Sequence, residues 1–436
     1  MLFDFEKAMN LVENCTTIKA SGKVVRVVGL TIESEGPMVH LGEHCFIKVL
    51  SNNTKIDAEV VGFNNDRVLL MPLGEMKGIG HGCEVIPSGR RLSIPVGESL
   101  LGRVLDGLGN PLDKKGPIEM EKYVTIDNEA PDPLDRKNIR EILNVGVKSI
   151  DSCLTVGKGQ RVGIFAGSGV GKSTLLGMIS RNSSAQINVI GLIGERGREV
   201  NEFLENDLGE EGMRNTVVVV ATSDKPALVR LKGASVATAI AEYFRDKGYS
   251  VMLMMDSLTR YAMAQREIGL AVGEPPATRG YTPSVFAELP KLLERTGTSS
   301  RGSITGLYTV LVDGDDMNDP IADAVRGILD GHIVLSRDLA TKNHYPAVDV
   351  LQSISRVMPN IVSEEHLFFS RKIREVLAIY KEAEDLINIG AYKEGSNSKI
   401  DYSISKIKEV EDLLKQNMNE VSDLNSTFES MAEIFR

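Results

Sequence analysis

The sequence has few cysteines, no long apolar segment and no excess of basic residues. Only 4 cysteines occur among 436 residues, and they lie too far apart to indicate a disulfide framework, so a reducing compartment such as the cytosol is expected. No apolar run approaches the roughly 20 residues that cross a bilayer. The acidic Asp4, Glu6 and Glu13 are unlike a secretory signal. The net charge of -10 disfavours broad binding to nucleic acid.

The length of the chain indicates more than one domain. A chain of 436 residues exceeds one ordinary hydrophobic core, so two or three domains are expected. With 42% hydrophobic and 25% charged residues, the composition is typical of a soluble globular protein. Residues 2–12 carry apolar side chains at three- and four-residue spacing and predict a short amphipathic helix. Such a terminal helix either packs on its own domain or docks on a partner or a membrane surface.

Residues 22–88 have the pattern of a small β domain. Short runs rich in β-branched residues, interrupted by Gly and Asn, predict a barrel or a sandwich. His40, His44 and Cys45 lie close together there. In strands a four-residue spacing does not bring two side chains together, and no fourth ligand is evident, so we favour ordinary strand residues over a metal site. From Pro95 to Asp151 the chain is rich in Gly, Pro and Asp, and turns are expected to dominate.

A Gly-rich loop between an apolar run and a helical pattern organises the whole chain. The run Val162–Ala166 leads into the loop, which ends in Gly171, Lys172 and Ser173, the order of a phosphate-binding P-loop. Glycines let backbone N–H groups turn toward phosphate oxygens, and the positive end of the following helix faces the same anion. Lys172 reaches the β- and γ-phosphates, and the Ser173 hydroxyl is a ligand suited to Mg²⁺.

The loop departs from the usual pattern at one position. Ala166 stands where Gly is usual, and alanine fits there if its φ is negative. The alternative is a Gly-rich turn without a ligand, but the order of strand, loop, Lys, Ser and helix favours nucleotide binding. The loop residues expected to contact the nucleotide are Gly167, Ser168, Gly169, Val170, Gly171, Lys172, Ser173 and Thr174.

Residues 152 to about 350 alternate apolar runs with helical patterns. This alternation predicts a mostly parallel sheet with helices on both faces. Ligands of such sheets bind at the C-terminal ends of the strands, where the Gly-rich loop falls. The strands expected are Arg161–Phe165, Gln186–Leu192, Thr216–Ala221, Val251–Met255, Ile304–Val312 and His332–Leu335.

Two acidic residues follow strands of this region. Asp256 ends an apolar run, where a carboxylate holds Mg²⁺, usually through water. Glu195 follows another run, where it can polarise a water for attack on the γ-phosphate, and the adjacent Arg196 can neutralise phosphate charge. The alternative for Glu195 and Arg196 is a solvated charge cluster, and spacing alone does not decide between the two.

Two further residues have two interpretations each. Arg356, near the end of the α/β region, is either an ordinary surface charge or an arginine finger supplied to a neighbouring subunit. Tyr345, which precedes a proline, either forms a turn or offers a ring on which an adenine stacks.

The C-terminal part is helical and charged from about Glu364. Apolar residues between Ile400 and Phe435 recur every three or four positions, which predicts a helical pair packed on the core rather than a free coiled coil. The apolar positions are Ile404, Ile407, Leu414, Met418, Val421, Leu424, Phe428 and Met431.

These motifs, in this order, resemble those of the catalytic subunits of rotary ATPases. The most similar group is the export ATPases of type III secretion, in their flagellar branch. The likeness covers nearly the whole chain from about residue 20, and the run Gly273–Ser284 is especially specific. The stretches that carry the likeness are Val96–Gly109, Ala166–Ser173, Gly194–Arg196, Asp256–Arg260, Gly273–Ser284 and Tyr345–Asp349.

The resemblance implies four parts and a ring. An amphipathic segment in residues 1–18 would precede a β-barrel in 19–92, a RecA-like α/β P-loop NTPase core in 93–355 and a C-terminal α-helical domain in 356–436. Six identical copies would form a homohexamer with ATP between subunits.

The resemblance also assigns roles to single residues. Lys172 and Ser173 become the phosphate and Mg²⁺ groups, and Asp256 becomes the carboxylate of the second NTPase motif. Glu195 becomes the residue that activates water. Arg196 becomes a contact to the γ-phosphate, and Arg356 becomes the finger that reaches the neighbour's ATP. Tyr345 becomes the platform on which the adenine stacks.

The implied function is Mg²⁺-dependent ATP hydrolysis that powers export of flagellar proteins, in the cytoplasm and at the inner face of the membrane. The loop ends in Lys-Ser rather than the Lys-Thr of synthase catalytic subunits, and Gly390–Asn397 replaces the acidic loop that meets the synthase rotor. The implied partners are a regulatory protein at the N-terminal segment, a coiled-coil stalk protein, export chaperones with their cargo, and a membrane export gate.

Three other functions share some or all of this pattern. A virulence-type secretion ATPase has all of these motifs, and a synthase catalytic subunit has most of them. A hexameric RecA-like motor on nucleic acid is the third. The net charge of -10 and the lack of an aromatic and basic stripe argue against it, so no nucleic acid partner is expected.

Overall fold

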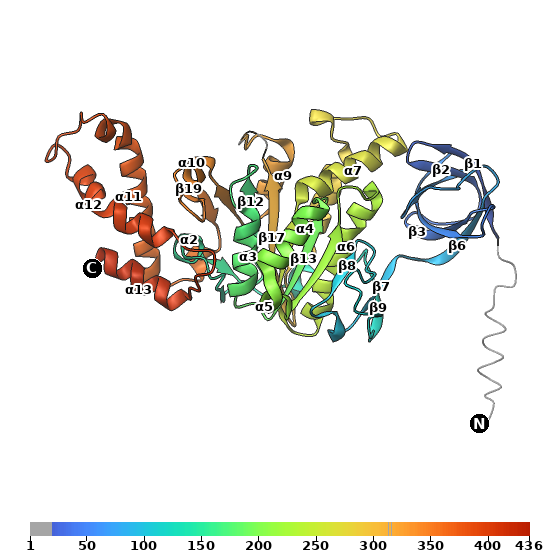
Figure 1. Cartoon of the computed structure of the whole chain (residues 1–436), viewed down its shortest axis with the longest axis horizontal. Helices are drawn as coiled ribbons and strands as arrows, with labels where there is room; N and C mark the ends of the chain where they lie inside the picture. The colour runs from blue at the N-terminus through green and yellow to red at the C-terminus, as the bar shows by residue number, and fades with distance from the viewer. Residues whose placement is uncertain (1–19, 313, 315) are drawn as a thin grey trace, which may run out of the picture. The chain divides into compact units, whose positions relative to one another are not determined.

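The structure is a computed structural model that describes residues 20–312, 314 and 316–436. The helix predicted for residues 2–12 lies outside the described residues. The chain divides into two compact units, of which the first holds a β-barrel and the second holds a large sheet with the C-terminal helices. The predicted fold class, a barrel followed by an α/β core and a helical domain, is confirmed (Figure 1).

The barrel of the first unit is closed by six strands in the order β1-β2-β5-β4-β3-β6. Its interior is apolar, with Val24, Ile32 and Leu70 fully buried. His44 pairs with Asp57 at 2.7 Å, and burial raises the pKa of the inward-facing Cys45 to about 12. The strands are β1 (Gly22–Val28), β2 (Thr31–Glu35), β3 (Glu43–Lys48), β4 (Lys55–Asn64), β5 (Arg67–Pro72) and β6 (Glu84–Arg91).

The second unit is built on a nine-stranded sheet with the order β19-β18-β12-β17-β15-β13-β14-β8 and a short β16 beside β17. The six predicted strands are present and mutually parallel. They are β12 (Arg161–Ala166), β13 (Ile187–Ile193), β14 (Thr216–Ala221), β15 (Ser250–Asp256), β17 (Ser303–Leu311) and β18 (Gly331–Leu335).

Two edge strands were not expected from the sequence. β8 (Val104–Asp106) lies in the stretch where turns were predicted, yet it pairs with β14. β19 (Val348–Ser355) pairs antiparallel with β18, and its register shifts between His332 and Val334. Short strands between turns, and strands with a bulge, lack the regular apolar period that makes a strand visible in sequence.

Helices cover both faces of this sheet because its central strands are apolar throughout. On β13, Ile190 and Leu192 join the core under α3 (Lys172–Asn182). The alternate Gly191 approaches Ala237 of α6 (Ala227–Asp246) so closely that a Cβ atom there would lie 3.2 Å from the alanine Cβ. Successive residues thus face opposite helices, as the period of a strand requires.

The remaining elements are short strands and connecting helices of the second unit. They are β7 (Ser93–Val96), β9 (Lys122–Thr125), β10 (Ile142–Leu143), β11 (Val156–Gly157), β16 (Gly297–Thr298), α2 (Lys148–Cys153), α4 (Gly197–Glu202), the π-helix η3 (Phe203–Leu208), α5 (Gly209–Met213), α7 (Leu258–Val272), α8 (Pro283–Glu294), α9 (Pro320–Ile328), α10 (Arg337–Thr341), and the 3₁₀ turns η1 (Glu98–Leu100), η2 (Pro133–Asp135), η4 (Thr278–Gly280) and η6 (Met358–Asn360).

Three C-terminal helices pack against α2, and the first of them also contacts β19: α11 (Glu364–Asn388), α12 (Ser398–Leu414) and α13 (Leu424–Phe435) (Figure 1). Ile373, Val410 and Met431 belong to the same hydrophobic core as the sheet, so these helices pack on the core as the sequence predicts. Three of the predicted apolar positions are exposed instead. Ile404, on α12, is 38% exposed. Met418 and Val421 lie between α12 and α13 and are 44% and 79% exposed, because the chain leaves the helix after Leu414.

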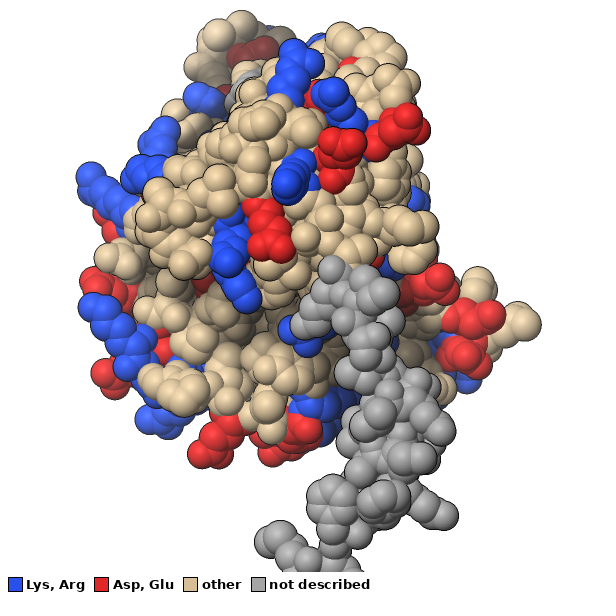
Figure 2. Space-filling view, turned by 90° about the vertical axis from the view of Figure 1, so that its right-hand side faces the viewer, with Lys and Arg blue, Asp and Glu red and all other residues tan. Residues whose placement is uncertain are grey.

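In the described part of the chain, no helix is both long enough and apolar enough to cross a membrane. Figure 2 shows one face of the molecule, on which Lys and Arg side chains lie among Asp and Glu side chains. Charges of both signs therefore meet solvent over this face.

Candidate active site

The Gly-rich loop connects the C-terminal end of β12 to the first turn of α3. Gly169 and Gly171 have φ of +79° and +87°, a conformation that side-chain-bearing residues rarely adopt. Ala166 ends β12 in extended backbone, where φ is negative, so alanine fits this position. Ser168 and Ser173 are exposed. The loop therefore opens its backbone N–H groups and the helix N-terminus to an anion in solvent.

Lys172 reaches across the sheet to a carboxylate on β15. Its Nζ lies 2.5 Å from Oδ1 of Asp256, and the Thr309 hydroxyl of the intervening β17 donates to the same oxygen at 2.6 Å. Burial favours the neutral form of Lys172, but the Asp256 and Glu195 carboxylates outweigh it and raise the lysine pKa. Lys172 is therefore a cation held between two acids at the C-terminal edge of the sheet.

Glu195 lies on the other side of this lysine, at the end of β13. Its Oε1 is 3.6 Å from Lys172 Nζ. Burial, then the Asp256 carboxylate and then Glu199, raise the pKa of Glu195 to about 7 against the pull of Lys172. A carboxylate with such a pKa takes up and releases a proton near neutral pH, as a general base must.

Arg260 is a candidate that sequence reasoning left without a role. Gly194, with φ +77°, brings the backbone before Glu195 against this arginine, and a Cβ at Gly194 would lie 2.7 Å from the Arg260 Cβ. Among the described residues, the buried Nε of Arg260 has no hydrogen-bond partner. The signal was its place in the motif Asp256–Arg260, one helical turn after the acid. Its guanidinium retains a donor for an anion.

Tyr345 lies beside the loop, although the two are far apart in sequence. A Cβ at Gly171 would lie 3.5 Å from two carbons of the tyrosine ring. The residue is 42% exposed, and the Tyr345 carbonyl accepts a hydrogen bond from the Gln416 N–H at 3.0 Å. An exposed tyrosine thus lies next to the Gly-rich loop.

Arg196 does not join the cluster around Lys172. Its side chain is 76% exposed and pairs with Glu199 on the first turn of α4 at 3.4 Å. In one copy of the chain, this arginine has the environment of a surface charge.

Arg356 lies at the opposite, N-terminal edge of the sheet, where the parallel strands begin. It follows β19, and its backbone N–H donates to the carbonyl of Asp330, just before β18. Asp330 lies beside Arg161 at the start of β12, whereas the loop follows the end of that strand. The strand is about 16 Å long at roughly 3.3 Å per residue, more than an extended arginine side chain spans. Arg356 cannot reach the loop of its own chain.

The residues around Lys172 fit a nucleotide phosphate with Mg²⁺. Ser173 and Asp256 offer hard oxygen atoms, which this cation prefers. Both hydrogen bonds that the structure shows for the Asp256 side chain use Oδ1, so Oδ2 is open to a metal or its water. The positive helix end, Lys172 and Arg260 supply the charge that a triphosphate needs.

Three parts of the chain match known families. Residues 24–89 match the ATP synthase alpha/beta family, beta-barrel domain, and residues 146–355 its nucleotide-binding domain. Residues 362–433 match the T3SS EscN ATPase C-terminal domain.

Relatives cover nearly the whole chain. The chain is 56% identical to the flagellum-specific ATP synthase of Bacillus subtilis, over 98% of each. It is 52% identical to the type 3 secretion system ATPase of Xanthomonas euvesicatoria, over 95% of this chain and 93% of the relative. Among solved structures, it matches the assembled ATPase EscN of enteropathogenic E. coli in complex with its central stalk EscO, with a TM-score of 0.88, 46% identity, and coverage of 95% and 99%. The chain therefore belongs to the ATP synthase alpha/beta family, in the group formed by the flagellar and type III secretion ATPases.

Proposed function

We propose that this ATP-hydrolysing enzyme works with Mg²⁺ as a ring of identical subunits, a homohexamer, and powers export of flagellar proteins through a type III secretion apparatus. One observation carries the ring: Lys172 and Arg356 lie at opposite edges of one sheet. A site that uses both must be built from two copies. The relative in B. subtilis is named flagellum-specific, and the EscN structure is an assembled one, which supports this proposal.

In the proposed mechanism each residue acts on a stated atom. On nucleotide binding, Lys172 turns from Asp256 to the β- and γ-phosphates. Ser173 and Asp256 would hold Mg²⁺, which when bound neutralises phosphate charge and orients the leaving group. Glu195 accepts the proton of the water that attacks the γ-phosphorus, and Arg356 of the neighbouring subunit stabilises charge on the transferring group. The bond between the γ-phosphorus and the β–γ bridging oxygen breaks as the water oxygen bonds.

Two further residues of the proposed site are Tyr345 and Arg196. The Tyr345 ring stacks on the adenine, consistent with its place beside Gly171. Arg196 approaches the γ-phosphate only if it leaves Glu199, its partner in this structure.

From the family likeness we also propose a regulatory protein at residues 1–18, a stalk protein in the ring, chaperones with cargo, and peripheral attachment to an export gate at the cytoplasmic face of the membrane.

A second candidate is an ATPase of virulence-type secretion. The identity to the X. euvesicatoria relative, 52%, is close to the 56% with the flagellar relative. Deleting the gene in its own host separates the two. Loss of flagella and motility, restored by the intact gene, supports the flagellar function, whereas intact motility with loss of effector secretion supports the second candidate.

The test of the ring measures ATPase rate against protein concentration, with mass photometry of the same samples and no other protein added. A specific activity that rises as homohexamers appear supports a site shared between copies. A specific activity that stays constant from monomer to hexamer contradicts the proposed role of Arg356. Copurification with unlike ring subunits would favour a synthase subunit instead.

A further inference from the structure

Arg356 lies at a corner that is assembled from three separate stretches of the chain. Its backbone N–H donates to the Asp330 carbonyl at 3.0 Å, and its Nη1 donates to the Leu329 carbonyl at 3.3 Å. The preceding Ser355 hydroxyl donates to the Thr155 carbonyl at 2.9 Å. The backbone of an exposed arginine is thus tied down on both sides.

Gln160 links the two halves of this corner. Its side chain is fully buried, and its Nε2 donates to the Ser355 hydroxyl at 3.1 Å and to the Asp330 carbonyl at 3.3 Å. Its Oε1 accepts from the Gly157 N–H at 2.9 Å. A buried amide with bonds on both ends fixes the spacing of its partners, since moving one leaves a polar group unpaired.

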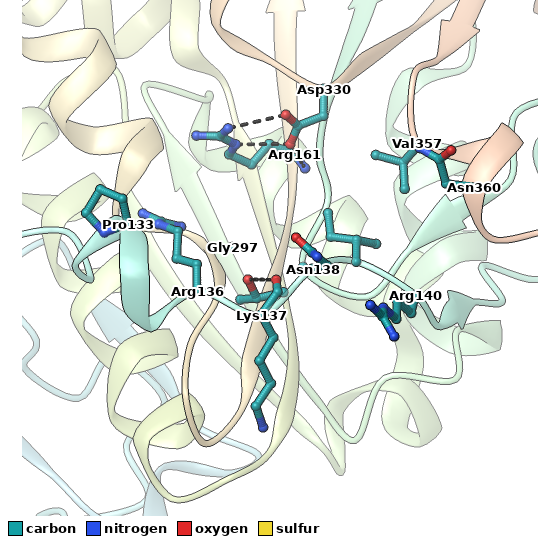
Figure 3. A pocket seen from close by; sticks show the side chains of 13 residues that line it. Pro133, Arg136, Lys137, Asn138, Arg140, Arg161, Gly297, Asp330, Val357 and Asn360 are labelled. Atoms are coloured by element: carbon teal, nitrogen blue, oxygen red, sulfur yellow. Dashed lines mark hydrogen bonds and ion pairs between the residues drawn. The ribbon is translucent and has the colours of Figure 1, made fainter.

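Asp330 is held in turn by Arg161, the first residue of β12. The Asp330 carboxylate accepts from the Arg161 N–H at 3.0 Å, from Nε at 3.1 Å and from Nη2 at 3.2 Å. Arg161 also bonds to Glu294. Figure 3 shows this pair on the wall of a cavity of about 560 Å³, which Val357 and Asn360, just after Arg356, also line.

None of these bonds is needed to bind nucleotide in the same chain, because the corner lies at the edge opposite the loop. They do determine the position of the Arg356 backbone, from which its side chain extends. A finger must meet a transferring phosphoryl group with its donors aligned, and a displacement of about 1 Å in such a group reduces catalysis by up to about 10²-fold.

We propose that Asp330 and Gln160 are positioning residues for Arg356: they fix its backbone at the place from which the guanidinium, once it leaves the Leu329 carbonyl, reaches the ATP of the neighbouring subunit. This inference rests on the proposed function. It adds residues that act at the neighbour's site although they touch no substrate.

The test is a double-mutant cycle between Asp330→Asn and Arg356→Ala, measured as kcat and KM of the assembled ring. Asp330→Asn keeps the shape of the side chain and removes the charge that Arg161 holds. We expect kcat to fall about 10-fold with KM nearly unchanged, because the residues proposed to bind the nucleotide lie at the C-terminal edge of the sheet, away from Asp330. In the Arg356→Ala background the same change should reduce kcat no further.

Two more variants keep the result interpretable. Lys137→Ala lies in the same cavity, but its side chain extends away from Asp330 (Figure 3), so its rate should equal that of the wild type. Ser355→Ala removes the hydroxyl that accepts from Gln160 and donates to the Thr155 carbonyl, and it should reduce kcat a few-fold. It replaces Asp330→Asn in the cycle if that variant does not assemble.

The outcomes separate the inference from the proposed function. If Asp330→Asn lowers kcat equally with and without Arg356, or leaves kcat unchanged, the positioning role is wrong while the finger stands. If Arg356→Ala itself keeps the wild-type kcat in an assembled ring, the proposed shared site is wrong. A loss that vanishes in the Arg356→Ala background supports the positioning role.

Discussion

The parallel strands of the central sheet begin at its N-terminal edge and end at its C-terminal edge, and these two edges are built differently. At the C-terminal edge, the loop with Gly169 and Gly171 is open, and Lys172 is held by carboxylates that a nucleotide can replace. At the N-terminal edge, Gln160 and Asp330 belong to a network of hydrogen bonds around the backbone of Arg356. One edge can change its partners, whereas the other keeps a fixed geometry.

This difference matches two different tasks. A substrate must enter and leave the first edge in every cycle, so its side chains need alternative partners. The second edge offers one charge to a neighbour, and its value depends on where that charge is held. Variants at the first edge should therefore change binding or chemistry within a subunit, and variants at the second should change only what assembly adds.

The largest expected effect at the first edge is that of Lys172→Ala. We expect loss of detectable ATP turnover and of tight nucleotide binding, because the lysine supplies the mobile charge for the phosphates. Binding is measured by titration of a fluorescent ATP analogue, and folding by circular dichroism. Lys158→Ala is the matched control, since this lysine pairs with Glu141 near the start of β12. Tight binding by Lys172→Ala would mean that the loop backbone suffices.

The next effect is that of Glu195→Gln, which keeps the size of the side chain and removes its basicity. We expect turnover to fall by roughly 10²-fold or more with nucleotide binding retained. Single-turnover hydrolysis and equilibrium binding separate the two quantities. Glu202→Gln, at the last residue of α4 and paired with Arg198, should behave like the wild type. Full turnover in Glu195→Gln would contradict its role as the base.

Tyr345→Ala should have a smaller effect that is confined to affinity. Loss of a stacking ring raises KM for ATP by about 5-fold, since such contacts contribute roughly 1 kcal/mol beyond burial. Tyr345→Phe keeps the ring and should retain the wild-type KM. Steady-state kinetics at saturating and limiting ATP give both constants. An unchanged KM in Tyr345→Ala would leave this residue as a turn beside the loop.

The smallest expected effect is a change with pH. Glu195 must be ionised to accept a proton, and its pKa is raised to about 7 by burial and Asp256. Hence kcat/KM of the free enzyme should rise a few-fold between about pH 6.5 and pH 7.5. The rise should be absent from the residual activity of Glu195→Gln. A rise centred near pH 4.5, or one that persists in the variant, would contradict the assignment.

Local patterns made much of the fold predictable. The six central strands and the C-terminal helices follow from apolar period and length, and the barrel from short β-branched runs. β8 and β19 did not follow, because short or bulged edge strands lack that period. The exposure of Val421 did not follow either, since it depends on where α12 ends. The boundaries predicted at residues 92 and 355 stay predictions.

The candidate site was predictable where it is contiguous in sequence. The loop, Asp256 and Glu195 each follow a strand of a parallel sheet, so the fold brings them to one edge. Thr309 and the corner of Gln160 and Asp330 carry no motif, because their partners lie on strands that are neighbours only after folding. Family likeness supplied Arg356, but only the structure shows that it faces away from its own loop.

The most direct test of a site shared between copies mixes two variants that each lack one half of the site. Lys172→Ala subunits keep Arg356, and Arg356→Ala subunits keep the nucleotide loop. In mixed rings each interface that joins an intact loop to an intact arginine is complete, so an equal mixture should recover about a quarter of the wild-type rate. A mixture no faster than the sum of its two components, with mixed rings confirmed by native mass spectrometry, would contradict the central claim.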